Sequence, residues 1–211
     1  LIASTLAGLD RQPAVLISAS AIGFYGDRGD EELTEASPAG TGFLPGVVEA
    51  WESSTAAAAS AGIRTVLVRT GSVLDAHGGA LARQLPLFRL GLGGRLGSGR
   101  QWVPWIALAD EVRAIMHLLS SGLVGPVNLT APNPVTNTEF TSTLARVLRR
   151  PAFLPVPRFG PALLLGRELA RDLLYSSARV LPAALESDGY RFRHPSLEPA
   201  LRALLGRPAG V

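Results

Sequence analysis

Small and hydroxyl-bearing residues end a short apolar run near the beginning of the chain. Residues 14–26 read AVLISASAIGFYG, and the branched apolar residues are typical of a strand buried on both faces of a parallel sheet. Ser18, Ala19 and Ser20 come next, and small residues let a cofactor or substrate approach the backbone at the carboxyl end of a strand, where open α/β sheets bind ligands. Taken alone, the residues favour a ligand site and an ordinary serine- and glycine-rich turn about equally.

A second apolar run, residues 65–68, ends in the same way. Arg69, Thr70 and Gly71 follow it, and Val73 comes shortly after. The pattern between the two runs predicts a helix, which gives the strand, helix, strand order of a right-handed parallel crossover. The carboxyl ends of both strands are therefore expected at one edge of one sheet.

Two tryptophans stand beside an arginine in residues 100–105, RQWVPW. Trp102 and Trp105 could wall a pocket in which the Arg100 guanidinium pairs with a phosphate or carboxylate. Without further information, the pattern favours a buried tryptophan pair that fixes a loop.

Helical and extended patterns alternate along the rest of the chain. Thr136 and Glu139 have the spacing of a capping box that opens a helix. Other helices are predicted at residues 43–61, 80–90, 110–120, 161–174 and 197–205, and further strands at 126–129 and 153–156. Residues 27–42 are predicted to be a surface loop whose acids are solvated rather than catalytic. The first of these helices is expected to bury one face, made of Leu44, Val47, Val48, Trp51 and Ala58.

The composition excludes several kinds of chemistry. The 211 residues are 47% hydrophobic and 18% charged, which suits one large globular domain with or without an appendage. There is no cysteine, and His77, His117 and His194 are far apart, so no metal site is predicted. All 20 basic residues are arginine, which excludes any mechanism that needs a lysine ammonium.

The charge distribution argues against a nucleic acid partner, and the lengths of the apolar runs argue against a membrane partner. Residues 141–211 carry 11 arginines and 5 acids, but no aromatic residues are interleaved with the arginines, so a solvated basic face is expected. No apolar run approaches the roughly 18 residues of a spanning helix, and the amino end lacks a basic region followed by an apolar core. We expect a cytoplasmic protein.

Several separated motifs resemble one known family. These motifs are SASAIGFYG, GFLPGVVEAWE, RTGSVL, PLFRLGLGGRLGSGRQWVPWI and GPVNLTAPNPVTNTEF. Together they resemble the atypical extended short-chain dehydrogenase/reductases described as sugar-nucleotide epimerase-like proteins. The resemblance implies an α/β fold, with the C-terminal part of a Rossmann-type doubly wound parallel sheet in residues 1–150. Residues 151–211 would form a small mixed domain on the substrate side, which resembles the family's C-terminal domain of unknown function.

The resemblance also implies NADP as the cofactor and a small-molecule substrate. The glycine-rich turn that holds the pyrophosphate in such enzymes is expected upstream of Leu1, so the chain would be the C-terminal two-thirds of a longer protein. In relatives a serine on the strand hydrogen-bonds the reacting oxygen, and Ser20 fits that role best, with Ser18 second. The implied cofactor contacts are Ser18, Ala19, Arg69, Thr70, Gly71 and Val73, and the implied substrate contacts are Arg100, Trp102 and Trp105.

One departure from the family pattern concerns catalysis. Working dehydrogenases have a Tyr-x-x-x-Lys pair in which the lysine lowers the tyrosine pKa. The equivalent positions here are Phe43 and Val47, which cannot exchange protons. Tyr25 is the nearest phenol and is predicted to be catalytic with Ser20, although a tyrosine at this place is also typical of a packing residue.

The resemblance implies an NADP-dependent oxidoreductase or epimerase that acts on a carbonyl or nucleotide-sugar-like substrate, with homodimerisation expected. The alternative is a non-enzymatic NADP-binding sensor or scaffold.

Overall fold

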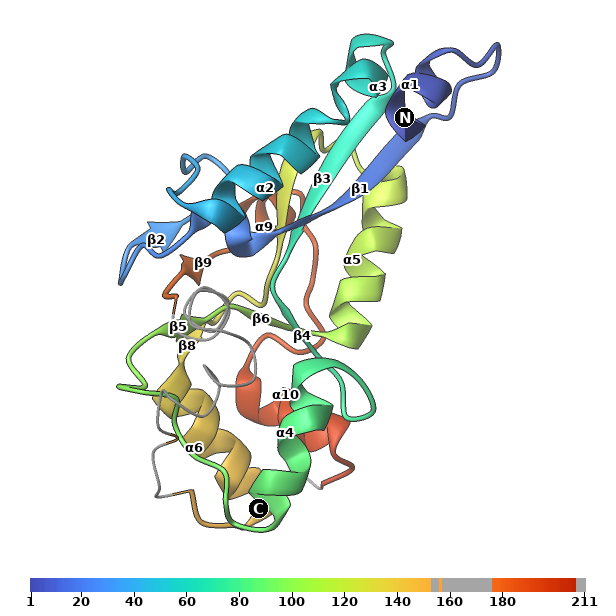
Figure 1. Cartoon of the computed structure of the whole chain (residues 1–211). Coiled ribbons are helices and arrows are strands. Elements are labelled where there is room, and N and C mark those ends of the chain that lie inside the picture. The colour runs from blue at the N-terminus through green and yellow to red at the C-terminus, as the bar shows by residue number, and fades with distance from the viewer. Residues whose placement is uncertain (153–155, 157–175, 208–211) are drawn as a thin grey trace.

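A parallel sheet forms the centre of the molecule (Figure 1). The computed structural model describes residues 1–152, 156 and 176–207. Strands β1 (Val15–Ala21), β3 (Arg64–Thr70) and β7 (Gly125–Leu129) lie in the order β1-β3-β7, and both pairings are parallel. The α/β class with a parallel sheet, predicted from the sequence, is confirmed.

Helices lie against both sides of this sheet (Figure 1). On one side are α2 (Phe43–Ser53) and α3 (Ala56–Ser60), which connect β1 to β3. On the other side is α5 (Leu108–Ser120), whose Ala114 and Leu118 pack with buried valines of β3 and β7. The sheet is thus covered as a parallel sheet requires, because its strands carry apolar side chains on both faces.

A second group of helices lies beyond the carboxyl ends of the strands (Figure 1). It comprises α4 (Gly79–Arg89), α6 (Asn137–Leu148) and α10 (Leu197–Leu204), which share one apolar core. Strands β4 (Ser72–Leu74) and β6 (Trp105–Ala107), paired in parallel, connect the sheet to this group. The predicted capping box is confirmed, since the Thr136 side chain accepts from the Glu139 N–H and the Glu139 carboxylate accepts from the Thr136 N–H.

Short strand pairs join the two parts. Strand β2 (Glu32–Leu33) pairs in parallel with β9 (Arg179–Val180), and β5 (Trp102–Val103) pairs antiparallel with β8 (Val135–Thr136). The predicted surface loop 27–42 therefore contains a strand, which its polar composition did not indicate. The remaining elements are α1 (Ile2–Ala7), the 3₁₀ helix η1 (Ile22–Tyr25) and α9 (Ala183–Ser187).

The helix predicted at residues 43–61 differs from the observed one in two ways. It is divided into α2 and α3, and its buried face is rotated. Val48 and Ala58 are buried as predicted, but the prediction is wrong for Val47 and Trp51, which are 44% and 46% exposed. The predicted helix 161–174 and most of the predicted strand 153–156 lie outside the described residues. Within the described ranges, no helix is both long and apolar enough to cross a membrane.

Gly40 allows the chain after η1 to approach the backbone of that helix. Its N–H donates to the Phe24 carbonyl (2.9 Å), and a Cβ at this position would overlap the Tyr25 carbonyl. We expect Gly40→Ala to lower the free energy of unfolding by about 1–3 kcal/mol, because the backbone must shift to admit the methyl group. The control is Gly46→Ala in α2, where a Cβ meets open space. Because alanine favours the helix, this variant should raise the free energy of unfolding by about 0.5–1 kcal/mol. Urea denaturation measures both, and equal midpoints for the two variants would contradict the expectation.

Candidate functional site

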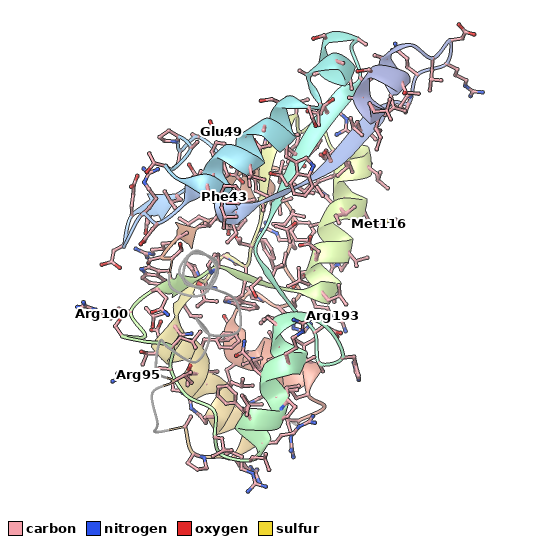
Figure 2. The ribbon with its side chains drawn as sticks, in the orientation of Figure 1. Phe43, Glu49, Arg95, Arg100, Met116 and Arg193 are labelled. Atoms are coloured by element: carbon pink, nitrogen blue, oxygen red, sulfur yellow. The ribbon has the colours of Figure 1, made fainter. Side chains whose placement is uncertain are left out.

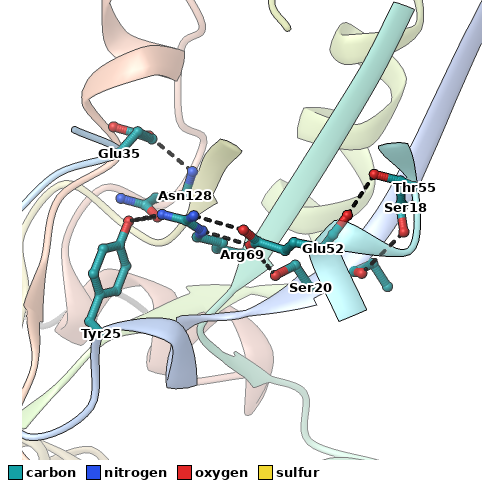
Figure 3. A network of polar contacts seen from close by, with 9 residues as sticks. Ser18, Ser20, Tyr25, Glu35, Glu52, Thr55, Arg69 and Asn128 are labelled. Carbon is teal, nitrogen blue, oxygen red and sulfur yellow. Dashed lines mark hydrogen bonds and ion pairs between the residues drawn. The ribbon is translucent and has the colours of Figure 1, made fainter. Parts of the chain in front are cut away.

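A row of polar residues crosses the sheet near the carboxyl ends of its strands. Ser20 on β1 lies opposite Arg69 on β3, which lies opposite Asn128 on β7. Glu52 of α2 joins the first two of these (Figure 3): Ser20 Oγ donates to Glu52 Oε1 (2.6 Å), and Arg69 donates from Nε to Oε1 and from Nη2 to Oε2, both at 2.8 Å. The two-point pairing of guanidinium and carboxylate is the strong, directional form of this interaction.

Tyr25 extends this network to the third strand (Figure 3). Arg69 Nη1 donates to the Tyr25 hydroxyl oxygen (3.1 Å), and the Tyr25 hydroxyl donates to Asn128 Oδ1 (2.7 Å). The Arg69 guanidinium also stacks on Phe24, with Cζ 3.4 Å from the ring centroid. Tyr25 and Asn128 have no exposed surface and Arg69 is 4% exposed, so the network is a closed interior structure.

The electrostatics of the network hold each group in one protonation state. Burial alone would raise the pKa of Glu52, but the hydrogen bonds from Arg69 and Ser20 bring it below its ordinary value, so the carboxylate is ionised. Burial raises the pKa of Tyr25, and the opposing contacts with Arg69 do not cancel that effect. A tyrosine with a raised pKa is a poorer proton donor near neutrality than the activated tyrosine of working dehydrogenases.

A cavity of about 480 Å³ lies beside this network. It is bounded by η1, the first turn of α2, β4, α4, β5 and the first turns of α6, so it lies where the strand ends meet the second group of helices. Its apolar lining consists of Ile22, Phe43, Leu44, Pro45, Leu74, Ala80, Leu81, Leu96, Trp102, Val103, Pro104, Phe140 and Ala178. Its polar side chains are those of Asp27, Thr41, Ser72, Gln84, Gln101, Asn137 and Ser176.

Only Trp102 among the sequence-predicted site residues lines this cavity. Ser20, Tyr25 and Arg69 are brought together in the buried network instead. Trp105 is fully buried, and its indole N–H donates to the Asn133 carbonyl (3.3 Å). Arg100 is exposed, and its side chain points away from the molecule (Figure 2).

The other predicted cofactor residues lie along β1 and after β3. Ser18 and Ala19 belong to β1, which is at one edge of the described sheet. The Thr70 hydroxyl donates to Glu111 Oε1 (2.9 Å). Gly71 packs closely against the Pro104 carbonyl, where a Cβ would have no room, and Val73 is half-buried in β4. Their roles toward a cofactor stay predictions.

Sequence reasoning missed Glu52 and the polar cavity residues. Glu52 follows Pro45 and Val48 on the buried face of α2, at the spacing that places residues on one side of a helix. An acid on the same helix face as buried apolar residues is the sequence signal that could have predicted a buried cationic partner. Thr41, Ser72 and Gln84 had no such signal, because their positions around one cavity depend on how three separate segments pack. In the described part of the chain, no group of histidines and acids has the arrangement of a metal site.

The parallel sheet, with its cavity at the carboxyl ends of the strands, defines a Rossmann-type α/β protein. Comparison with known proteins gives the particular family. The chain is 46% identical over 200 residues to an epimerase family protein of Mycobacterium tuberculosis, an alignment that covers 94% of this chain and 66% of the relative. It is 35% identical over 207 residues to human epimerase family protein SDR39U1, covering 97% of this chain and 70% of the human protein. The chain belongs to this epimerase family.

Solved structures agree with this assignment. The crystal structure of human SDR39U1 with NADPH matches with a TM-score of 0.90 at 33% identity, covering 97% of this chain and 70% of that one. A nucleoside-diphosphate sugar epimerase from Corynebacterium glutamicum matches with a TM-score of 0.77 at 38% identity, covering 97% of this chain and 40% of that one. Residues 156–204 match a domain of unknown function, DUF1731. The chain spans about two-thirds of the length of the mycobacterial and human relatives.

Proposed function

We propose that this chain contains the nicotinamide end and the substrate cleft of an NADP-dependent oxidoreductase or epimerase. The observation that carries the proposal is the cavity at the carboxyl ends of β1 and β3, in a chain whose human relative has been crystallised with NADPH. Parallel α/β sheets bind nucleotides and their substrates at this edge.

The described residues fit the nicotinamide end of such a cofactor. Ile22 and Gly23 line the cavity immediately after β1, and Ser72 lines it immediately after β3. The Ser72 N–H donates to the Pro104 carbonyl (2.8 Å). The Ser72 hydroxyl has no hydrogen-bond partner in the part of the chain that the structure describes. That hydroxyl is available to a carboxamide. A bound nicotinamide ring supplies hydride transfer, and this chain supplies the walls that place the ring.

Among the described residues of the cavity, the proton for such a reaction has no conventional donor. By the resemblance, Phe43 and Val47 stand where working dehydrogenases have their tyrosine and lysine, and the Tyr25 hydroxyl is bonded to Asn128 and Arg69 outside the cavity. Ser20 likewise donates to Glu52. We therefore assign Ser20 and Tyr25 to holding the strand ends in place, and we assign the Thr41 hydroxyl of the cavity to the reacting oxygen, with water as the proton source.

A second candidate function follows from the same observation. Without an activated proton donor among the described cavity residues, the chain would bind a nicotinamide cofactor without turnover, as a sensor or scaffold. Oxidation of NADPH in the presence of carbonyl compounds separates the two functions: measurable consumption supports the enzyme, whereas cofactor binding without consumption supports the sensor.

We expect NADPH to bind more tightly than NADH when nicotinamide fluorescence is followed during titration. The titration is performed on this chain and on a version extended to the length of its relatives. Ser72→Ala should weaken binding roughly 3- to 10-fold, the value of one neutral hydrogen bond, whereas Ser60→Ala, an exposed serine on α3, should not change it. Absence of binding by both versions would reject the proposed cofactor.

A further inference from the structure

Acidic side chains lie on the Trp102 side of the cavity. Asp27 is the sole charged side chain among the described lining residues, and its Oδ1 accepts from the Ser177 N–H (3.1 Å). Asp30 is close by, because its Oδ1 accepts from the Trp102 indole N–H (2.9 Å). One acid thus lines the cavity and a second contacts its Trp102 wall, where a phosphate would meet repulsion.

Among the described residues, the cation that contacts Trp102 is already balanced in charge. The Arg179 guanidinium stacks on Trp102, with Cζ 4.8 Å from the ring, and its Nη2 pairs with Glu32 Oε1 (3.0 Å). Arg179 does not line the cavity. A diphosphate needs two or more full positive charges or a dedicated set of N–H donors, and the first turn of α2 offers only the partial charge of a helix end.

The walls of the cavity suit an apolar body with one neutral polar group. Phe43, Trp102 and Phe140 supply aromatic surface from three different elements. Thr41 and Gln84 also line the cavity, and within residues 1–152, 156 and 176–207 their side chains form no hydrogen bonds. A hydroxyl and an amide recognise a carbonyl or alcohol oxygen without requiring charge.

We propose that the substrate of this cleft is an uncharged carbonyl compound with an apolar ring or chain, and not a nucleotide sugar. Trp102 and Phe140 contact its apolar body, and Thr41 and Gln84 bind its oxygen. This inference rests on the proposed function for its reaction, but binding of the substrate body requires only the cavity.

Ligand-observed NMR on the chain without cofactor tests the inference, with acetophenone and 4-phenyl-2-butanone as uncharged probes and UDP-glucose as the nucleotide sugar. We expect saturable binding of at least one ketone and none of UDP-glucose. Trp102→Ala should weaken ketone binding at least tenfold, and Gln84→Ala roughly 3- to 10-fold. The matched control is Trp51→Ala, which removes a half-exposed tryptophan outside the cavity and should leave ketone binding unchanged.

Three results would overturn the inference. The first is no saturable ketone binding, and the second is ketone binding that both cavity variants leave unchanged. The third is saturable UDP-glucose binding, and its loss in Arg179→Ala would identify the cation beside Trp102 as a phosphate ligand. If Trp102→Ala does not fold, ketone binding by the Gln84→Ala variant tests the inference. Since no cofactor is present, these results are independent of the NADPH titration: ketone binding with no NADPH binding would reject the proposed function and retain the cavity's ligand class.

Discussion

Glu52→Ala is expected to lower the free energy of unfolding by about 3–5 kcal/mol, the largest effect of any single substitution considered for this chain. The variant leaves the Arg69 guanidinium buried, with its side chain 5% exposed, and without its anionic partner. It also removes the acceptor of the Ser20 hydroxyl. An uncompensated buried charge costs far more than a lost surface contact, because the guanidinium keeps its charge and loses its partner.

Two further variants identify the cause of this loss. Glu49→Ala removes an acid from the exposed face of the same helix (Figure 2) and should change stability by less than about 0.5 kcal/mol. The double variant Glu52→Leu with Arg69→Met replaces the ion pair by apolar groups and should recover most of the loss. Urea denaturation of the four proteins provides the comparison. A Glu52→Ala protein as stable as the Glu49→Ala protein would show that the pair contributes nothing.

The same pair predicts how stability depends on pH. The pKa of Glu52 is lowered in the folded state, so its stabilising contribution is present above the ordinary value of 4.5 and is lost as the pH falls through the folded pKa. The melting temperature of the Glu49→Ala control should therefore fall more steeply below pH 4.5 than that of the double variant.

Asp110→Ala is expected to lower the free energy of unfolding by about 3 kcal/mol through a different mechanism. The Asp110 carboxylate has no exposed surface and accepts from two consecutive backbone amides, those of Arg193 (2.7 Å) and His194 (2.8 Å). The Tyr190 hydroxyl donates to the backbone carbonyl of Asp110 (2.9 Å). Asp110 thus joins the first turn of α5 to the segment before α10, and its removal leaves two backbone donors without their acceptor.

A graded series separates this mechanism from a loss of packing. Asp110→Asn keeps one acceptor oxygen and should lose about half as much stability as Asp110→Ala, while Asp10→Ala, an exposed acid, should lose none. Hydrogen exchange should show the loss first at the amides of Arg193 and His194. Equal stability of the alanine and wild-type proteins would refute the role assigned to this carboxylate.

Elements that depend on local pattern were predicted well from the sequence. The apolar runs at 65–68 and 126–129 are strands because branched apolar residues suit a sheet covered on both faces, and the Thr136 capping box formed because its contacts lie within one turn. The buried face of α2 was predicted wrongly because the prediction used the apolar residues alone, whereas Glu52 lies on the buried face. Its burial depends on Arg69, which is 17 residues away and on another element.

The candidate site depends still more on distant contacts. Ser20 and Arg69 were expected at one edge of the sheet, and they are neighbours there, but the direction of their side chains could not be predicted without Glu52. Trp102 was predicted from its type and lines the cavity, while the neighbouring Trp105 is in the core. The two tryptophans begin separate strands of two and three residues, and the alternation of side chains along such short strands does not reveal which tryptophan faces a cavity.

The buried network also bears on the order in which the chain folds. Its contacts span very different sequence separations: 17 residues for Arg69 and Glu52, 44 for Arg69 and Tyr25, and 103 for Tyr25 and Asn128. Closing a longer loop costs more chain entropy, so the ion pair can form within the β1, α2, β3 unit before β7 arrives. Until Asn128 docks, the Tyr25 hydroxyl lacks its acceptor, so the buried network is completed only when β7 joins the sheet.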